Sequence, residues 1–114
     1  MRIKRDKLDI LFASYIKARD KYCQRCGRMN SLQTAHFIGR RNRAVRHDGE
    51  NSCLLCFSCH QHFHENPLEF VEWFKARLGD RNYDMLQARA SRPQKIDREL
   101  IRLYLEQEIK NYEM

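Results

Sequence analysis

Two short segments, CQRCG at residues 23–27 and CFSCHQHFH at residues 56–64, decide the fold of this chain. Each contains two cysteines separated by two residues, and 29 residues lie between the pairs. A CxxC pair closes in a tight turn and offers two thiolates, so two such pairs supply the four ligands of a tetrahedral Zn²⁺ ion. Gly27 follows the first pair, where it can adopt the positive φ that such a turn often needs. We therefore predict a structural zinc site made by Cys23, Cys26, Cys56 and Cys59.

A fifth cysteine, Cys53, is left over from this set. It lies three residues before Cys56 and could compete as a ligand, but we favour a role as a small buried hydrophobic residue. The alternative for the other four is a set of buried thiols or a redox pair, but no thioredoxin-like βαβ pattern surrounds them. Zinc would also add binding free energy to the folding of a chain of only 114 residues.

The charge balance favours a polyanionic partner. Lys and Arg number 22 against 15 Asp and Glu, which gives a formal net charge of +7. A basic but merely solvated surface has the same composition, so the motifs must decide. No apolar run approaches the roughly 18 residues of a membrane helix, and the N-terminus lacks a signal-peptide segment. We expect a cytoplasmic protein, in which cysteines favour metals over disulfides.

Hydrophobic periodicity predicts helices on both sides of the zinc segments. The first spans residues 6–21, with Leu8, Leu11, Phe12, Tyr15 and Ile16 on one face. Another is predicted for residues 51–65, capped by Asn51 or Ser52 and ended before Pro67. Further helices are expected from Pro67 to about residue 80, around residues 83–90, and from about residue 94 to residue 111.

Between the first two helices the sequence predicts strands. Residues 31–38 form a short strand, and the arginine-rich residues 39–46 form an exposed loop that leads into a second strand. His47, Asp48 and Gly49 end that stretch.

Histidines carry the functional argument, because four cysteines alone also describe a non-enzymatic zinc ribbon. On a helix, which turns about 100° per residue, His60 and His64 share a face next to that of the cysteines. Their i, i+4 spacing is typical of paired imidazole metal ligands. His62 points away from both faces, and we assign it no role. His36, in TAHFIGR at the end of the first predicted strand, is by default a satisfied core histidine.

The order CxxCG…AHFI…N…LCxxCHxxxH resembles the HNH endonucleases over residues 23–64. A closer resemblance is to the NinG/Rap phage recombination endonucleases, and it includes LFASYIKARDKYCQRCG, VRHDGEN and CHQHFHENPLEF. It implies an α+β fold with a small zinc-supported ββα-metal core at residues 23–66. An N-terminal helix in residues 1–22 and C-terminal helices in residues 67–114 flank this core, and we expect all of them to form a single domain.

The resemblance also implies roles for individual residues. His36 is the general base that deprotonates the attacking water, since a histidine accepts a proton close to neutral pH. Asn51 fixes the hairpin–helix junction and holds the His36 ring in line. His60, with His64 as a second ligand, binds a catalytic Mg²⁺ or Mn²⁺, which offsets the charge of the phosphodiester and of the leaving alkoxide. The implied products carry 5′-phosphate and 3′-hydroxyl ends.

The chain departs from the HNH pattern at Ala35, where many HNH enzymes have a metal-binding Asp or His. Other ligands would then come from Thr34, Gln33, His47, water or the DNA. Ala35 therefore supports a rival hypothesis, a zinc-stabilised DNA-binding or adaptor module without catalysis. A third hypothesis is a sequence-specific HNH restriction or packaging nuclease.

The loop after His36 is expected to bind DNA phosphates, with an ordinary solvated basic loop as the alternative. Its basic residues are Arg40, Arg41, Arg43 and Arg46, and Arg2, Lys4, Arg5 and Lys7 could add a second basic arm. No base-reading helix is recognisable. Following the resemblance, we expect a phage or prophage protein that cuts branched or other recombination-intermediate DNA.

The last predicted helix carries an apolar stripe. We expect this stripe to pack on the core, with a homodimer contact as the alternative. Its members are Ile96, Leu100, Leu103, Tyr104 and Ile109.

Overall fold

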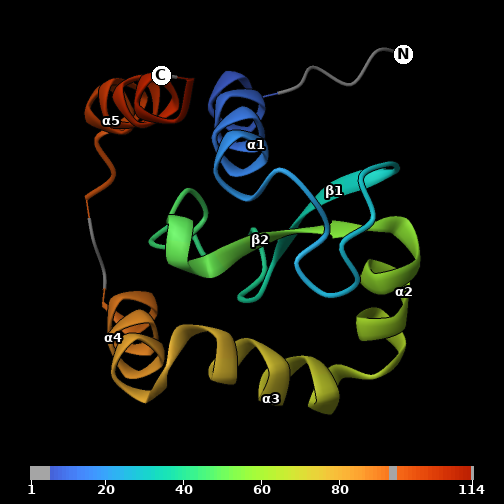
Figure 1. The fold of residues 1–114 in the computed structure, drawn as a ribbon. Coiled ribbons are helices and arrows are strands. Elements are labelled where there is room, and N and C mark those ends of the chain that lie inside the picture. The colour runs from blue at the N-terminus through green and yellow to red at the C-terminus, as the bar shows by residue number, and fades with distance from the viewer. Residues whose placement is uncertain (1–5, 93–94, 114) are drawn as a thin grey trace, which may run out of the picture.

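A computed structural model describes residues 6–92 and 95–113 (Figure 1). The elements follow in the order α1 (Lys7–Asp20), β1 (Leu32–His36), the 3₁₀ helix η1 (Gly49–Asn51), β2 (Ser52–Cys56), α2 (Phe57–Glu65), α3 (Pro67–Leu78), α4 (Asp80–Ser91) and α5 (Arg98–Glu113). β1 and β2 form an antiparallel pair in which His36 lies opposite Ser52 and Leu32 opposite Cys56. The predicted α+β class with a ββα core is confirmed.

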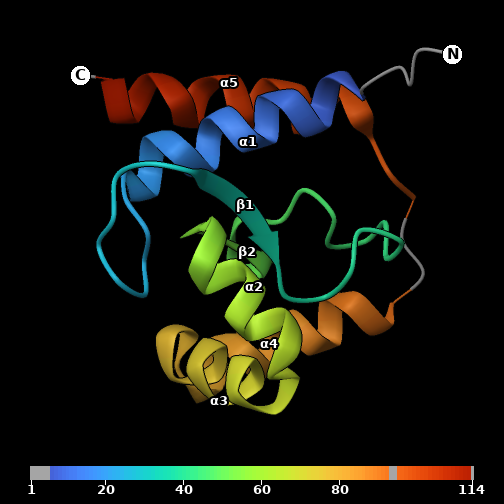
Figure 2. The same cartoon turned by 90° about the vertical axis from the view of Figure 1, so that its right-hand side faces the viewer.

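The two-stranded sheet lies between two layers of helices (Figures 1 and 2). α1 and α5 lie side by side over one face, and α2, α3 and α4 lie on the other side. Because successive strand residues point to opposite faces, the sheet contributes to two cores. The core under α1 contains Phe12, Ile16, Leu54 and Leu105. The core on the other face contains Ala35, Cys53, Leu55, Phe63 and Phe74.

α1 has the start and the buried face that its sequence predicts. The Asp6 carboxylate accepts a hydrogen bond of 2.8 Å from the backbone N–H of Leu8, which satisfies a donor at the helix start. Phe12 and Ile16, on one side of the helix, are buried against the sheet. This helix fixes the position of the sheet face that carries His36.

The largest difference from the sequence-based expectation lies at residues 51–56. We expected these residues to begin a helix capped by Asn51 or Ser52, but Ser52–Cys56 is β2, and α2 begins only at Phe57 with Cys56 as its cap. The second strand expected after the arginine-rich loop is thus present, but it lies where the helix was expected to begin. All five residues of β2 are buried, so the segment lacks the alternation that identifies a half-buried strand. A short buried run of this kind fits a helix and a strand equally well.

α5 faces the core with a different side from the one predicted. Leu100, Leu103 and Tyr104 are 63%, 51% and 55% exposed, so the expectation that this stripe packs on the core is wrong for them. The face against α1 is a row spaced by four residues, made of Ile101, Leu105 and Ile109. The sequence carries apolar residues on both sides of this helix, and periodicity alone selected the wrong one.

Some predictions concern residues outside the described chain. These are the basic residues Arg2, Lys4 and Arg5 and the start of the last helix near Gln94. Within residues 6–92 and 95–113, no helix combines the length and the apolar character needed to cross a membrane.

Candidate functional site

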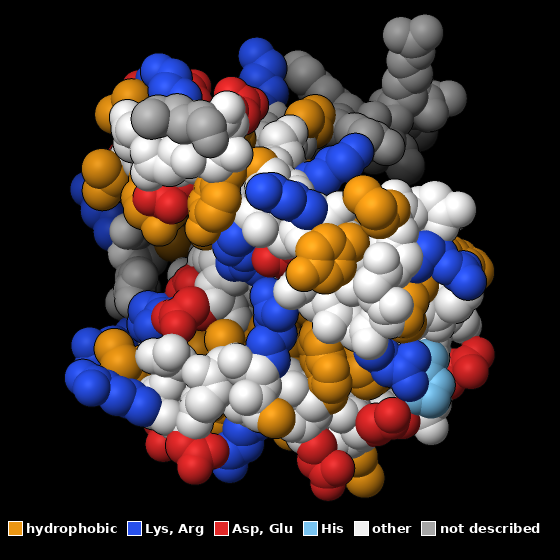
Figure 3. Space-filling view, viewed as in Figure 1, with side chains coloured by type: hydrophobic (Ala, Val, Ile, Leu, Met, Phe, Trp, Pro, Cys, Tyr) orange, Lys and Arg blue, Asp and Glu red, His pale blue; other side chains and the backbone are white. Residues whose placement is uncertain are grey.

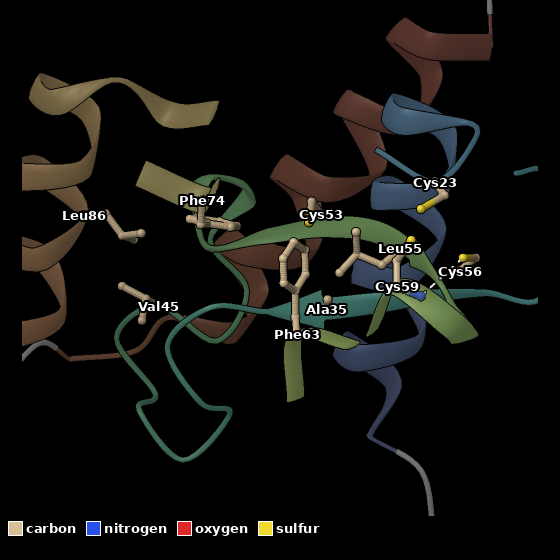
Figure 4. Close-up of a cluster of buried hydrophobic side chains, with 10 residues drawn as sticks. All are labelled: Cys23, Ala35, Val45, Cys53, Leu55, Cys56, Cys59, Phe63, Phe74 and Leu86. Carbon is tan, nitrogen blue, oxygen red and sulfur yellow. Dashed lines mark hydrogen bonds between the residues drawn. The ribbon is translucent and has the colours of Figure 1, made fainter. Parts of the chain in front are cut away.

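The four cysteines of the two CxxC pairs meet at one end of the larger core. Figure 4 shows Cys23, Cys56 and Cys59 at this end, far from Leu86 at the other. The four sulfur atoms, including that of Cys26, all lie within 4.8 Å of one another. Zn–S bonds of about 2.3 Å in a tetrahedron place sulfurs about 3.8 Å apart, so the cluster has the size of a zinc site.

Local backbone structure prepares this cluster. Gly27 has a φ of 81° and donates its backbone N–H to the Cys23 carbonyl oxygen at 2.8 Å, which closes the first turn. At the second pair, the backbone N–H of Cys59 points to the Cys56 sulfur at 3.5 Å. Such N–H donors stabilise thiolates, which are the metal-binding form.

The crowding of the thiols affects their acidities. Burial opposes ionisation of Cys23, but backbone hydrogen bonds outweigh it and lower its pKa to about 6. Burial raises the pKa of Cys59, and the neighbouring thiols raise it further, although the Arg25 guanidinium donates to its sulfur at 3.4 Å. Several thiolates in one place repel each other, and a bound divalent cation removes this obstacle.

Cys53 has no part in the cluster. It is fully buried in the core, and burial raises the pKa of its thiol to about 12. An inert thiol of this kind acts as a small apolar residue.

His60 and His64 lie on α2 beside a small pocket, which Gln33 of β1 also lines. The Nδ1 atom of His60 lies 2.7 Å from the Gln33 Oε1 atom. Because this oxygen only accepts, Nδ1 carries the proton and Nε2 keeps the lone pair that can bind a metal. Burial, and next the neighbouring His64, lowers the pKa of His60 and so favours the neutral, metal-binding form.

Within the described residues, a complete ligand set for a second metal does not form from acidic, histidine or cysteine side chains. Among the described residues, only the four cysteines bring three or more such groups close enough to hold an ion. Ala35, at the position where a further ligand was considered, is fully buried. Gln33 of β1 contacts His60 and lines the same pocket as His64.

His36 ends β1 on the side that faces α1. Its ring packs on Phe12, with ring centres 5.7 Å apart, and its Nε2 atom lies 2.9 Å from the Arg46 carbonyl oxygen. A carbonyl only accepts, so Nε2 carries the proton and Nδ1 is the atom that can take another. Burial lowers the pKa of His36 more than the hydrogen bond to Arg46 raises it. The ring is therefore neutral, as a general base must be, at neutral pH.

The two groups of histidines occupy different surroundings. His36 contacts Phe12 and Arg46, whereas His60 contacts Gln33. No hydrogen bond or ring contact joins His36 to His60 within the part of the chain that the structure describes. Since β1 residues alternate in direction, Gln33 points toward α2 and His36 toward α1.

Asn51 is fully buried and ties the chain after β1 to the start of β2. Its Nδ2 atom donates to the carbonyl oxygens of Ile38, at 2.9 Å, and Val45, at 3.1 Å. Its Oδ1 atom accepts from the Ile38 backbone N–H at 2.8 Å. These bonds hold both ends of the arginine-rich loop near His36, and none of them goes to the His36 ring.

We expect Asn51→Ala to lower the free energy of unfolding by about 3 kcal/mol, because it leaves several loop backbone groups without partners. Chemical denaturation followed by circular dichroism measures the effect. Asn82→Ala is the matched control, since Asn82 is exposed and makes one hydrogen bond, to the Leu78 carbonyl oxygen. An equal loss in the two variants would contradict this role of Asn51.

The four arginines of the loop fall into two pairs. Arg40 and Arg46 bind the carboxylate of Asp9 in α1. Arg41 and Arg43 are exposed, and within residues 6–92 and 95–113 neither forms an ion pair. On the face shown in Figure 3, Lys and Arg side chains are interspersed with acidic and hydrophobic ones.

Sequence reasoning missed Asp9. It lies on a helix that was interpreted as packing only through its apolar residues, and its partners are more than 30 residues away in the chain. A sequence signal that could have identified Asp9 is its acidic character in an otherwise basic N-terminal region.

Residues 23–66 match a protein-family model described as HNH endonuclease. The matched segment contains both cysteine pairs, β1, β2 and α2. No curated protein and no solved structure matches the chain. The resemblance to HNH endonucleases is thus confirmed for residues 23–66, and it indicates a nuclease or DNA-binding function.

Proposed function

We propose that this protein is a metal-dependent endonuclease that hydrolyses phosphodiester bonds in DNA. The observation that carries the proposal is the coincidence of the HNH match with a ββα unit. In that unit His36 ends β1, Asn51 precedes β2, and His60 lies in α2. The packing of α1 on the sheet and of α5 on α1 supports one nuclease domain over the whole chain.

In this proposal the chain's own residues divide the work. His36 accepts the proton of the attacking water at Nδ1, because its Nε2 atom already donates to the Arg46 carbonyl oxygen. His60 and His64 hold Mg²⁺ or Mn²⁺, and Gln33 fixes the orientation of the His60 ring. The metal ion, when bound, offsets the negative charge on the phosphate and on the leaving oxygen.

The phosphate contacts are assigned to Arg41 and Arg43, the two loop arginines that Asp9 does not bind. We expect the double change Arg41→Gln and Arg43→Gln to weaken DNA binding and to reduce the slope of log K against log salt by about 2. Fluorescence anisotropy with a labelled duplex over a salt series measures both quantities. Arg102→Gln is the control, since Arg102 pairs with Glu99 and Glu106 on α5. An equal change of slope for Arg102→Gln would contradict the assignment.

The proposed substrate is branched or other recombination-intermediate DNA, and the proposed setting is the bacterial cytoplasm, as a phage or prophage enzyme resembling NinG/Rap. A panel of four-way junction, flap, nicked, single-stranded and mixed-sequence duplex DNA, each with Mg²⁺ or Mn²⁺, tests this choice. The proposal predicts cleavage near the branch. Discrete bands from plain duplex would instead identify a sequence-specific HNH nuclease.

Two observations favour a second candidate, a non-catalytic zinc-stabilised DNA-binding module. Ala35 is buried where a ligand was considered, and His36 and His60 face different surroundings. This candidate predicts binding to the same DNA panel with no product in any divalent metal.

The nuclease proposal includes a homodimer as an option. The surface that would form it contains the exposed Leu100, Leu103 and Tyr104 of α5. Sedimentation analysis of the full chain measures the oligomeric state.

A further inference from the structure

Three side chains of residues 40–47 converge on one carboxylate of α1. The Oδ2 atom of Asp9 accepts from Arg40 at 2.5 Å, and it also accepts from the Arg46 Nη2 atom. The Oδ1 atom of Asp9 accepts from the Arg46 Nε atom at 3.0 Å and lies 2.8 Å from the His47 Nε2 atom. The Asp9 side chain is 20% exposed and that of His47 only 6%. The contact is therefore better shielded from solvent than an ordinary surface ion pair.

Asp9 stays ionised throughout the neutral range. Burial opposes its ionisation, but hydrogen bonds from Arg46, His47 and Arg40 outweigh burial and hold its pKa well below the ordinary range. A bidentate contact with a guanidinium, as between Asp9 and Arg46, is directional as well as charged. Asp9 therefore fixes the Arg46 side chain in one place.

Arg46 connects this contact to the candidate base. Its backbone carbonyl oxygen is the partner of the His36 Nε2 atom. Phe12, one turn after Asp9 on α1, packs on the rings of both His36 and His47, with centres 5.7 and 5.8 Å apart. Asp9 and Phe12 thus hold residues 46 and 47 against the His36 ring from one face of one helix.

We infer that Asp9 is a positioning residue for His36, and that it also withholds Arg40 and Arg46 from DNA phosphates. By anchoring Arg46, it keeps the Arg46 carbonyl where it holds the proton on Nε2 of His36 and leaves Nδ1 to accept a proton. The inference rests on the proposed nuclease function for its catalytic consequence. Its structural part, the control of the His36 ring by Asp9, stands on contacts alone.

The two roles of Asp9 predict opposite effects of Asp9→Asn. The cleavage rate at saturating DNA should fall about 10- to 100-fold, because the base loses its fixed orientation. DNA affinity should rise about 3- to 10-fold with a steeper salt dependence, because two arginines become available to phosphates. A merely structural role would lower both the rate and the affinity, or leave both unchanged.

The test measures single-turnover cleavage, DNA affinity and the ¹⁵N shifts of the His36 ring in the full, zinc-loaded chain. Wild type should show His36 almost wholly as the Nε2–H tautomer, and Asp9→Asn should show a mixture of tautomers. Asp6→Asn is the matched control, with the same change of charge at the cap of the same helix, since Asp6 pairs with Arg98 instead of the loop. It should leave the His36 spectrum and the cleavage rate unchanged.

Two further variants keep the inference falsifiable. Asp9→Glu retains the charge and should restore part of the rate. Arg46→Ala, combined with Asp9→Asn, should add little to the loss of rate, since the two changes break the same contact between Asp9 and Arg46. An unchanged His36 spectrum and an unchanged rate in folded Asp9→Asn protein would overturn the inference. If the wild type cleaves no DNA, the proposed function fails, and the His36 spectrum still decides the structural part by itself.

Discussion

Removal of zinc is expected to unfold the protein at ordinary temperatures. The cysteine cluster joins the turn after α1, the end of β2 and the first turn of α2, so its loss separates the segments that make the ββα unit. Structural zinc contributes on the order of 10 kcal/mol to folding, which is comparable to the roughly 5–15 kcal/mol of total stability of a typical domain. We expect Cys56→Ser, or a strong chelator at neutral pH, to abolish the cooperative thermal transition seen by circular dichroism.

Metal analysis and a matched cysteine variant complete this test. The purified protein should hold one zinc per chain, and Cys53→Ala should keep both the metal and the thermal transition, with a loss of about 1–2 kcal/mol from the smaller side chain. Cys53 and Cys56 are equally buried, so burial alone does not explain a difference between the two variants. A zinc-free chain with an unchanged melting temperature would refute the structural role of the metal.

Replacement of His36 by Ala is expected to lower the cleavage rate about 100- to 10,000-fold, the usual contribution of a positioned general base. His62→Ala is the control, because His62 is also a histidine of the matched segment but contacts Glu69 on α3. Single-turnover cleavage of one DNA substrate by both variants measures the difference. Equal rates for His36→Ala and wild type would exclude His36 as the base.

The pH dependence of the wild-type rate gives a second measure of the same residue. A base acts when it is unprotonated, and burial lowers the pKa of His36 below its ordinary value of 6.5. The midpoint of the decline in rate with falling pH should therefore lie below 6.5, and the decline should be absent from the residual activity of His36→Ala. A decline centred well above this value would identify another group as the base.

The sequence predicted those parts of the fold that have a periodic pattern or a specific spacing. Phe12 and Ile16 of α1 showed the helical pattern of a half-buried helix, and the spacing of Cys23 and Cys26 from the second pair predicted one metal cluster. β2 could not be predicted in this way, because both of its faces are buried and its five residues carry no alternation. The consequence was a helix placed about six residues too early.

Contacts between distant segments were out of reach of the sequence. The identity of His36 and Asn51 as candidate residues came from the motif, but the partner of the His36 ring, the Arg46 carbonyl, is a backbone group that no motif specifies. Asp9 was missed because its partners lie in a loop whose path depends on Asn51 and on the packing of α1. The departure at Ala35 was visible in the sequence, whereas the contact between Gln33 and His60 was not.

The most direct test of the central proposal is the cleavage of supercoiled plasmid DNA by the full, zinc-loaded chain with Mg²⁺, with Mn²⁺, and with neither ion. The proposal predicts nicked and linear products that appear only with an added divalent ion, and a higher ion concentration for half-maximal rate in His60→Ala than in wild type. Folded, zinc-loaded protein that binds the plasmid but yields no product with either ion, or that cuts equally well without them, would contradict it.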